Sequence, residues 1–448
     1  MNTNIIEGNP TKKFFIEMIT RDISIEDAII DLLDNSIDGA TQINQDDLSN
    51  FFINIEIDGD KLLIQDNCGG FSLERAKKYA FRFGRPEEAP TIKRSVGRFG
   101  IGMKRALFKM GKSFTVESQK DGEHFLVSVD VDSWCNKVTR MTTENGDIVE
   151  VDDWTFESTM VNYLNAENGT TILVTNLKDD VKALFEKDDF LSSLSNCITK
   201  MLCFSLIKGM NITLNHKPLY ANCPELFMTE NTRPYYIEGD VNDVHYKIIA
   251  GLGMIGDPKL SGWYVFCNNR LVLEGDQTSL TGWGVNSMPK WHIDYVMFRG
   301  FVFLDSPETS NLPLTTTKKG LDASSTIYRK IMPHMRNGMI KLTSFLKSIT
   351  GLKEEANDYR KMICETSDRL NIVNIRNYYS DILGEKSFVA PELDLQKIAE
   401  KKDTVRIAYD VNKKTADIAK NNADVSSYKE LGKTAFNYYI KMEGIDYE

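Results

Sequence analysis

Two acidic side chains and an amide near the N-terminus have the spacing of one helix face. Asp31 and Asn35 are four residues apart and Asp38 follows three residues later, so the three side chains project from the same side of a helix. A carboxylate can orient an attacking water, while an amide oxygen beside it helps to hold Mg²⁺. A solvated polar stripe on an amphipathic helix gives the same pattern, so this motif alone leaves both interpretations open.

A second motif follows a strand-like segment. Asp66 can accept a hydrogen bond from an exocyclic amine such as that of adenine, and Gly69 and Gly70 let the backbone approach a flat base closely. A common turn closed by Asn and Gly is the alternative interpretation.

Two further motifs contain glycine. Gly97, Gly100 and Gly102 precede a predicted helix, where free backbone amides could cradle phosphates and Lys104 would add a positive charge. This run does not follow a strand, as a dinucleotide-binding fingerprint does, and it lacks the GK[ST] ending of a P-loop. The fourth motif, Gly169–Thr171, opens a strand whose hydroxyls could support Asp66.

The elements that must position these motifs can be predicted from periodicity. Helical spacing of apolar residues begins at Ser24, and alternation or helical spacing marks further elements in the first 180 residues. The predicted strands are 51–57, 61–64, 113–119, 124–131 and 170–176, and the predicted helices are 73–83 and 103–110, with a long loop at 84–102 and an acidic hairpin insertion within 134–168. Helices and strands mixed in this way favour an α/β sandwich over βαβ repeats.

A second region has its own mixture of elements. The sequence predicts helices at 190–207 and 324–347 and strands at 211–214, 235–237, 245–251, 262–267 and 296–304. We therefore divide the chain into a polar, loosely held leader (1–21), a first domain (22–180), a second α/β domain (181–350) and a charged helical region (351–448).

Composition narrows the class of protein. The 448 residues are 42% hydrophobic and 26% charged, which is typical of a soluble globular protein. The net charge of −10 argues against non-specific binding of nucleic acid by the surface as a whole. The sequence has no apolar run long enough for a membrane span and no signal-peptide pattern, and its 7 scattered cysteines form no CxxC pair. We expect a cytoplasmic protein without a membrane association.

The order and spacing of the four motifs resemble the GHKL ATPases, the superfamily of gyrase-type topoisomerases, MutL, MORC proteins, heat-shock chaperones and sensor histidine kinases. The N-box resembles Asp31–Ala40, the DxGxG box Asp66–Gly70, the lid Gly97–Lys104 and the last box Gly169–Thr171. The resemblance covers roughly residues 15–350 and is closest to bacterial MORC/MutL-like proteins. It implies an α+β fold: a Bergerat-type α/β sandwich, a transducer-like domain and a helical C-terminal region.

The resemblance also implies roles for individual residues. Asn35 would coordinate Mg²⁺, Asp66 would bind the adenine amine, and Asp31 would be the catalytic base. The residues expected to contact ATP are Asn35, Asp38, Asp66, Gly69, Gly70, Gly97, Arg98, Phe99, Gly100, Ile101, Gly102, Met103, Lys104, Thr170 and Thr171. Hydrolytic subfamilies usually have Glu where this chain has Asp31, so slow turnover is expected.

The second domain supplies one more candidate. Leu312–Gly320 resembles the loop from which Lys318, or its neighbour Lys319, would reach the γ-phosphate. An exposed Thr/Lys turn is the alternative. The segment Gly262–Glu274 also resembles the MORC/MutL-like group, in which its Asn-Arg turn would lie near a dimer interface.

The predicted function is hydrolysis of ATP to ADP and phosphate by an ATP-gated, dimerising switch or clamp, with DNA or a partner protein as candidates for what it acts on. The alternative is a non-hydrolysing ATP-binding scaffold or regulatory subunit in a multi-protein system, for example in bacterial defence or repair. A histidine-kinase type of protein kinase is disfavoured, because the residues before Asp31 contain no histidine to accept the phosphate.

Overall fold

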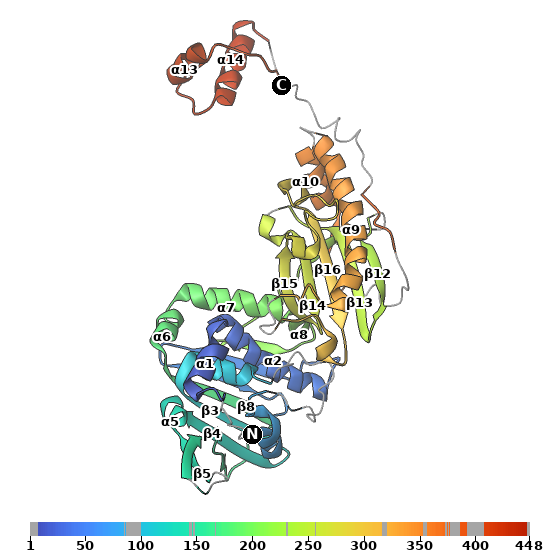
Figure 1. Cartoon of the computed structure of the whole chain (residues 1–448). Coiled ribbons are helices and arrows are strands. Elements are labelled where there is room, and N and C mark those ends of the chain that lie inside the picture. The colour runs from blue at the N-terminus through green and yellow to red at the C-terminus, as the bar shows by residue number, and fades with distance from the viewer. Residues whose placement is uncertain are drawn as a thin grey trace, which may run out of the picture. The chain divides into compact units, whose positions relative to one another are not determined.

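The computed structural model describes residues 8–84, 86, 100–142, 146, 148–165, 167–229, 232–255, 257–315, 320–352, 356–371, 374, 376, 386–391 and 407–445. Contacts divide the chain into two compact units, residues 1–392 and 393–448 (Figure 1). The first unit contains two main sheets with their helices.

The first sheet has eight strands in the order β10-β9-β1-β2-β8-β3-β4-β7. Only β1 and β9 pair in parallel; the other neighbours are antiparallel. The strands are β1 (Phe52–Ile57), β2 (Lys61–Asp66), β3 (Gly111–Lys120), β4 (Glu123–Asp130), β7 (Thr159–Met160), β8 (Gly169–Leu177), β9 (Asn211–Leu214) and β10 (Lys217–Pro218). The sheet therefore takes strands from beyond residue 180, where the sequence analysis ends the first domain.

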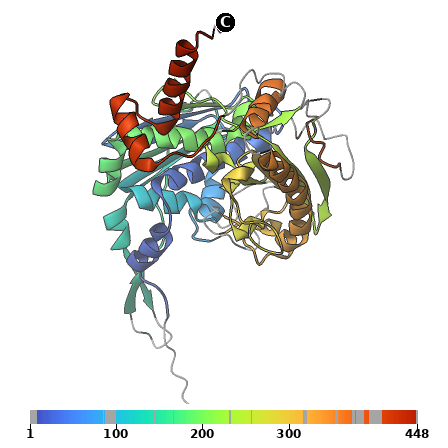
Figure 2. The ribbon, with the colours of Figure 1, turned by 90° about the horizontal axis from the view of Figure 1, so that it is seen from above.

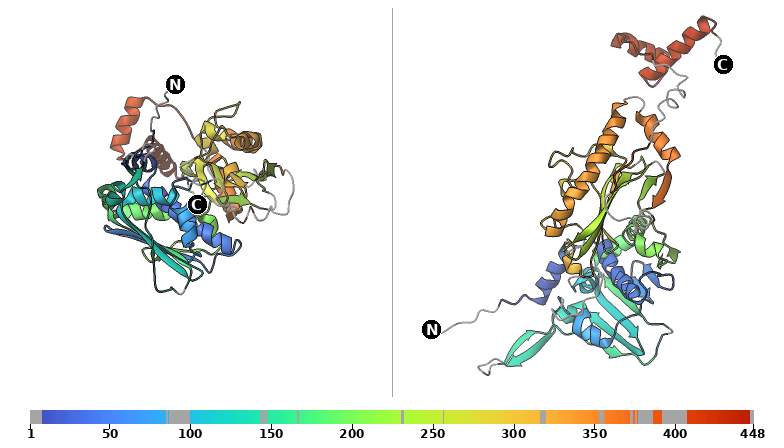
Figure 3. Two further views of the ribbon diagram at one scale, coloured as in Figure 1. Left: turned by 60° about the horizontal axis from the view of Figure 1, so that its bottom comes forward. Right: turned by 90° about the vertical axis from the view of Figure 1, so that its right-hand side faces the viewer.

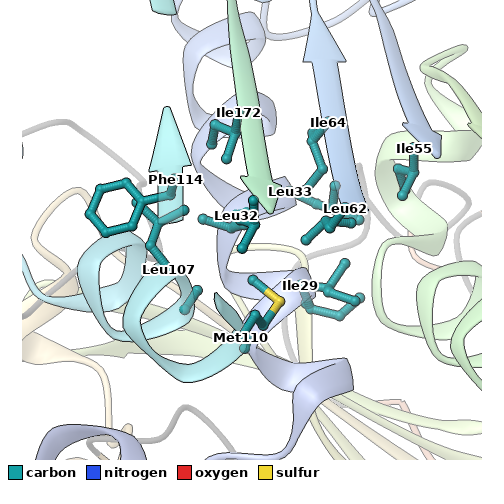
Figure 4. Packing of buried hydrophobic residues seen from close by; sticks show 14 of the residues in the cluster. Ile29, Leu32, Leu33, Ile55, Leu62, Ile64, Leu107, Met110, Phe114 and Ile172 are labelled. Atoms are coloured by element: carbon teal, nitrogen blue, oxygen red, sulfur yellow. The ribbon is translucent and has the colours of Figure 1, made fainter. Parts of the chain in front are cut away.

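Two helices cover one face of this sheet, α2 (Ile25–Ile43) and α4 (Gly102–Met110). Strand β1 alternates between buried and half-buried residues, as expected for a sheet with one packed face. Figure 4 shows Ile29, Leu32 and Leu33 of α2 facing the strands that carry Ile64 and Ile172. Each fully buried aliphatic side chain of this kind contributes about 1.5–3 kcal/mol.

The N-terminus of α2 is capped by its own sequence. The Asp27 amide donates to the Ser24 hydroxyl at 3.2 Å, and Glu26 and Asp27 lie in the first turn, where negative charge is favourable. The cap fixes where the helix begins and hence which face carries the polar residues of the first motif.

The leader contains a packed helix, α1 (Lys12–Arg21), which the sequence analysis did not anticipate. The Lys12 ammonium is buried and donates to the carbonyls of Trp134 and Lys137, both at 2.6 Å. The Phe15 ring packs edge-on against Phe83 at 5.1 Å. These contacts tie α1 to an aromatic cluster that also includes the short helix α5 (Val131–Cys135).

Smaller elements surround the first sheet or project from its domain. The acidic insertion contains a hairpin of β5 (Val138–Thr142) and β6 (Ile148–Asp152), which projects from the rest of the domain in the right-hand view of Figure 3. A further group consists of helices, namely α3 (Leu73–Arg75), the π-helical turn η1 (Ala76–Ala80), α6 (Asp179–Phe185), α7 (Asp188–Met201) and α8 (Cys203–Ile207).

The second sheet has five strands in the order β12-β13-β16-β14-β15. They are β12 (Tyr235–Val241), β13 (Val244–Leu252), β14 (Gly262–Cys267), β15 (Arg270–Asp276) and β16 (Phe298–Asp305). The long helix α9 (Thr326–Gly351) packs on this sheet (Figure 2), and a Cβ at its Gly338 would lie 2.8 Å from the Tyr235 ring. Strand β15 was not predicted, although it presents Arg270, which contacts helix α2 of the first domain.

The remaining elements lie around these sheets or in the second unit. They are β11 (Glu225–Met228) paired with β17 (Asp368–Asn371), α10 (Ala356–Thr366), the 3₁₀ turns Pro258–Leu260, Ser279–Thr281, Ile293–Tyr295 and Thr309–Asn311, and, in the second unit, α13 (Lys413–Asn422) and α14 (Tyr428–Met442). Among the residues described above, no helix has the length and apolar character that crossing a bilayer requires.

Candidate functional site

Asp66 is the centre of the polar group at the end of β2. Its carboxylate is buried and accepts hydrogen bonds from the Ser36 hydroxyl at 2.7 Å, the Cys68 amide at 2.8 Å and the Thr170 amide at 3.3 Å. Burial raises the pKa of Asp66, while these three donors act in the opposite direction. The carboxylate is therefore held in one orientation by α2, its own turn and strand β8.

Glycines allow three backbone segments to meet around this carboxylate. A Cβ at Gly169 would lie 2.0 Å from the Asp66 carbonyl oxygen, and one at Gly70 would lie 2.1 Å from that of Gln119. Gly69 and Gly70 also have positive φ angles of 92° and 57°, which residues with a side chain rarely adopt. Any larger residue at Gly70 or Gly169 would push the strand ends apart.

Asp31 forms a second polar centre, five residues before Ser36 on α2. Its carboxylate is buried and accepts a hydrogen bond from the Arg105 guanidinium at 2.5 Å. A Cβ built on Gly102 would lie 3.4 Å from the same carboxylate oxygen. The first turn of α4 therefore packs directly on Asp31, and the structure brings together residues of the first and third motifs.

Asn35 and Asp38 lie on the more open side of α2. Asn35 is exposed and Asp38 is half-buried. Mg²⁺ usually retains water and binds one or two protein oxygens together with substrate phosphates, so a single exposed amide one turn beyond Asp31 fits such an ion. No group of three or more His, Cys, Asp or Glu side chains able to hold a metal occurs in the described parts of the chain.

Lys104 does not point toward Asp31. It is buried, and its ammonium donates to the Ala80 carbonyl at 2.6 Å and lies 5.8 Å from the centre of the Phe83 ring. Burial lowers the pKa of Lys104 to about 7. Its predicted contact with a triphosphate stays a prediction.

The two threonines of the fourth motif lie on opposite faces of β8. Thr170 is in register with Asp66, and residues 170, 172 and 174 share the face on which Ile172 and Val174 are buried against the helices. Thr171 lies on the other face, opposite Gln65. Thr170 and Asp66 are therefore brought together, whereas the Thr171 hydroxyl is not.

The predicted lid and lysine loop are described only in part. Gly97, Arg98, Phe99, Lys318 and Lys319 lie outside the described residues, whereas Gly100, Ile101, Gly102 and Met103 lie at the start of α4. Both ends of the lysine loop are described.

The stem of that loop is attached to strand β15. Leu314 and Leu321 form a β-bridge, and the Gly320 amide donates to the Val272 carbonyl at 3.1 Å. Val272 is two residues from Arg270, so the Gly320 end of the predicted lysine loop is attached to the strand that contacts α2.

Arg270 is a member of the site that sequence reasoning missed. Its guanidinium forms a buried ion pair with Asp34 of α2, although 236 residues separate the two in the chain. The Asn-Arg turn that contains it was expected near a dimer interface because of the resemblance. Its contact with α2 lies within one chain.

Comparison with known proteins agrees with this geometry. Residues 23–166 match a protein family described as "Histidine kinase-, DNA gyrase B-, and HSP90-like ATPase". No match was found among curated protein sequences. The matched range contains α2, Asp66 and α4, and it ends just before β8.

Residues 23–166 are thus similar to GHKL-type ATPase domains, and they lie within a mixed α+β protein. Such a domain indicates ATP binding, with Mg²⁺ as its usual partner ion and ATP hydrolysis as the general reaction of the superfamily. The resemblance to GHKL ATPases is confirmed at this level, and the MORC/MutL-like subtype stays a prediction.

Proposed function

We propose that this protein is an ATP-gated conformational switch that binds Mg·ATP between α2, β2 and α4, hydrolyses it slowly and forms a homodimer in the ATP-bound state. The switch would act on DNA or on a partner protein. The hydrolytic reaction is ATP and water giving ADP and phosphate.

The observation that carries the proposal is the state of Asp66. A carboxylate offers about four acceptor positions, and the three protein donors on Asp66 leave capacity for one more. An exocyclic amine such as that of adenine is a donor of the right kind. The carboxylate is held in one orientation, which supports a base-binding site over the alternative interpretation of an ordinary solvated turn.

Asp31 supports the hydrolytic half of the proposal. Asp31 would orient the water whose oxygen attacks the γ-phosphorus; the bond from that phosphorus to the bridging oxygen breaks, and ADP leaves with the electron pair. The water proton passes to Asp31 or to the departing phosphate. To do this, Asp31 must share or exchange the Arg105 contact that it makes in the structure.

Calorimetry with Mg·ATP tests the binding site. We expect Asp66→Asn to weaken ATP binding about 100-fold, because the amide offers a donor where the base needs an acceptor. Asp60→Asn is the matched control, since the Asp60 side chain is 90% exposed in the β1–β2 turn, and its affinity should match that of the wild type. Equal affinities of all three proteins, or no binding by the wild type, would refute the proposed site.

A second candidate function is favoured by one specific contact. The buried Asp31–Arg105 pair neutralises the charge of the predicted base, which suits an ATP-binding scaffold that does not hydrolyse ATP. Steady-state release of phosphate separates the two candidates. A wild-type protein that binds ATP tightly and releases no phosphate, with or without DNA, would be a scaffold.

A further inference from the structure

The Arg270–Asp34 ion pair is the most deeply buried charge contact between the second sheet and the ATPase domain among the described ion pairs. Each side chain is 4% exposed, and the guanidinium donates directly to the carboxylate. Removing one member of such a pair leaves an uncompensated buried charge, which is strongly unfavourable. The two charges are therefore needed together at the contact between α2 and β15.

The charges around Arg270 come from α2. Burial alone would lower the pKa of Arg270, but the carboxylates of Asp34 and Asp31 outweigh that effect, so the pKa is raised. Asp31 is three residues before Asp34, on the same helical face, and is itself paired with Arg105. A continuous row of charges thus runs from β15 through α2 to α4.

The hairpin that presents Arg270 is firmly supported. Asn268 and Asn269 form its two-residue turn with positive φ angles of 47° and 68°, as in the turns that suit β-hairpins. The Asn268 side chain accepts from the Ser306 amide at 3.0 Å, and Asn269 accepts from Arg376 at 2.5 Å. Because both residues of the turn are held by hydrogen bonds, a movement of β15 would move Arg270 with it.

The same strand is connected to the predicted lysine loop. Val272 of β15 holds one end of that loop through the Gly320 amide. The described end of the loop at Gly320 and the ion pair of Arg270 are therefore carried by the same strand. The two connections lie two residues apart on one strand.

We propose that Arg270 is a positioning residue: through its ion pair with Asp34 it sets the orientation of α2, and so the placement of Asp31, according to the position of the second domain. This inference rests on the proposed function, because Asp31 is taken there as the base. It goes further in assigning the coupling between the domains to a single side-chain pair.

The test compares full-length variants. Arg270→Ala should leave the KM for ATP within about threefold of the wild type and lower kcat about 10-fold or more, since binding groups remain and the base is misplaced. Arg270→Lys, which keeps the charge, should restore kcat to within about threefold. Lys247→Ala is the matched control, because Lys247 forms an ion pair with Glu238 at 3.3 Å inside the second sheet, and it should behave as wild type.

Hydrogen exchange without nucleotide gives a readout that does not depend on catalysis. Arg270→Ala should speed the exchange of amides in residues 28–40 of α2, and Lys247→Ala should not. If Arg270→Ala does not fold, the double variant Asp34→Asn/Arg270→Gln removes both charges together and should show the same loss of kcat with normal KM.

The outcomes separate this inference from the proposed function. A wild-type protein that binds no ATP would overturn the proposed function, while exchange in α2 would still decide whether Arg270 positions that helix. Unchanged kcat and unchanged α2 exchange in Arg270→Ala would overturn the inference and leave ATP binding intact. Loss of folded protein lowers the apparent kcat without changing KM, so kcat is expressed per ATP-binding site counted by calorimetry. A kcat per site equal to that of the wild type would also overturn the inference.

Discussion

At the scale of single residues, the predicted base Asp31 is buried and paired with Arg105 in the structure. Its carboxylate is buried against the first turn of α4 and shared with Arg105, so its orientation is fixed by two helices before any substrate arrives.

Replacing this carboxylate should separate binding from turnover. We expect Asp31→Asn to reduce kcat by about 100-fold or more while the affinity for ATP stays within about threefold, because an amide cannot take up the water proton but still accepts from Arg105. Phosphate release and calorimetry on the same preparation measure the two effects. Turnover by Asp31→Asn at the wild-type rate would exclude Asp31 as the base.

Lys104 gives a prediction on pH. Its folded-state pKa of about 7 lies below the ordinary value of 10.5, so between those values the unfolded chain binds a proton that the folded protein does not. The free energy of unfolding should therefore rise with pH across this window, by at most about 1.4 kcal/mol per pH unit from this group. Below about pH 7 both states are protonated, and this contribution no longer changes with pH.

Denaturant unfolding of wild type and Lys104→Met at several pH values isolates this group. The variant should lose the rise between about pH 7 and about pH 10, and the difference between the two curves should be flat below about pH 7. Lys112→Met, an exposed lysine two residues after α4, serves as the control and should keep the wild-type slope. Parallel curves for wild type and Lys104→Met would mean that burial does not lower the pKa of Lys104 in solution.

At the scale of elements, the site depends on three backbone segments that meet without side chains. Gly169→Ala would place a Cβ 2.0 Å from the Asp66 carbonyl oxygen, so β8 and β2 must separate. We expect the free energy of unfolding to fall by about 2–4 kcal/mol and ATP binding to be lost or greatly weakened. Gly351→Ala is the control: a Cβ there meets nothing within 4 Å, and stability should change by less than about 1 kcal/mol.

The sequence predicted the elements with a strong local period. The helical spacing after Ser24 and the alternation in 51–57 and 61–64 agree with α2, β1 and β2, because these elements bury one face against each other. Asp66, Thr170 and Ser36 could be placed near each other only through the family's motif order. The mixed α+β class follows from the same local patterns.

The two buried ion pairs of α2 could not be predicted from the sequence, for a physical reason. Asp31 and Arg105 are 74 residues apart in the chain, and Asp34 and Arg270 are 236 residues apart. A local sequence pattern carries no information on contacts between residues so far apart. Strand β15 did carry a signal, since Asn268-Asn269 between two apolar runs suits a two-residue hairpin turn. Helix α1 was missed because its short apolar pattern is interrupted by charged residues, and its burial depends on the aromatic cluster.

At the scale of the whole molecule, helix α1 presents an apolar surface that bears on the proposed dimer. Lys12, Ile16 and Thr20 face the domain, whereas Phe14 and Met18 on the opposite side are 59% and 52% exposed. Two large apolar side chains one turn apart on a surface helix are a suitable contact for a second copy of the chain. We expect the ATP-bound homodimer to bury them.

The double variant Phe14→Ser/Met18→Ser tests this contact. With a non-hydrolysable ATP analogue and Mg²⁺, sedimentation should show the wild type passing from monomer to dimer, and the variant should dimerise about 100-fold more weakly, because it loses about 3 kcal/mol of apolar burial. Its affinity for the nucleotide should be unchanged, since neither side chain faces Asp66 or Asp31. Ile293→Ser, which replaces a 50% exposed residue of the second domain, should dimerise like the wild type. A wild-type chain that stays monomeric at saturating analogue would remove dimerisation from the proposed function, and a double variant that dimerises normally would move the interface away from α1.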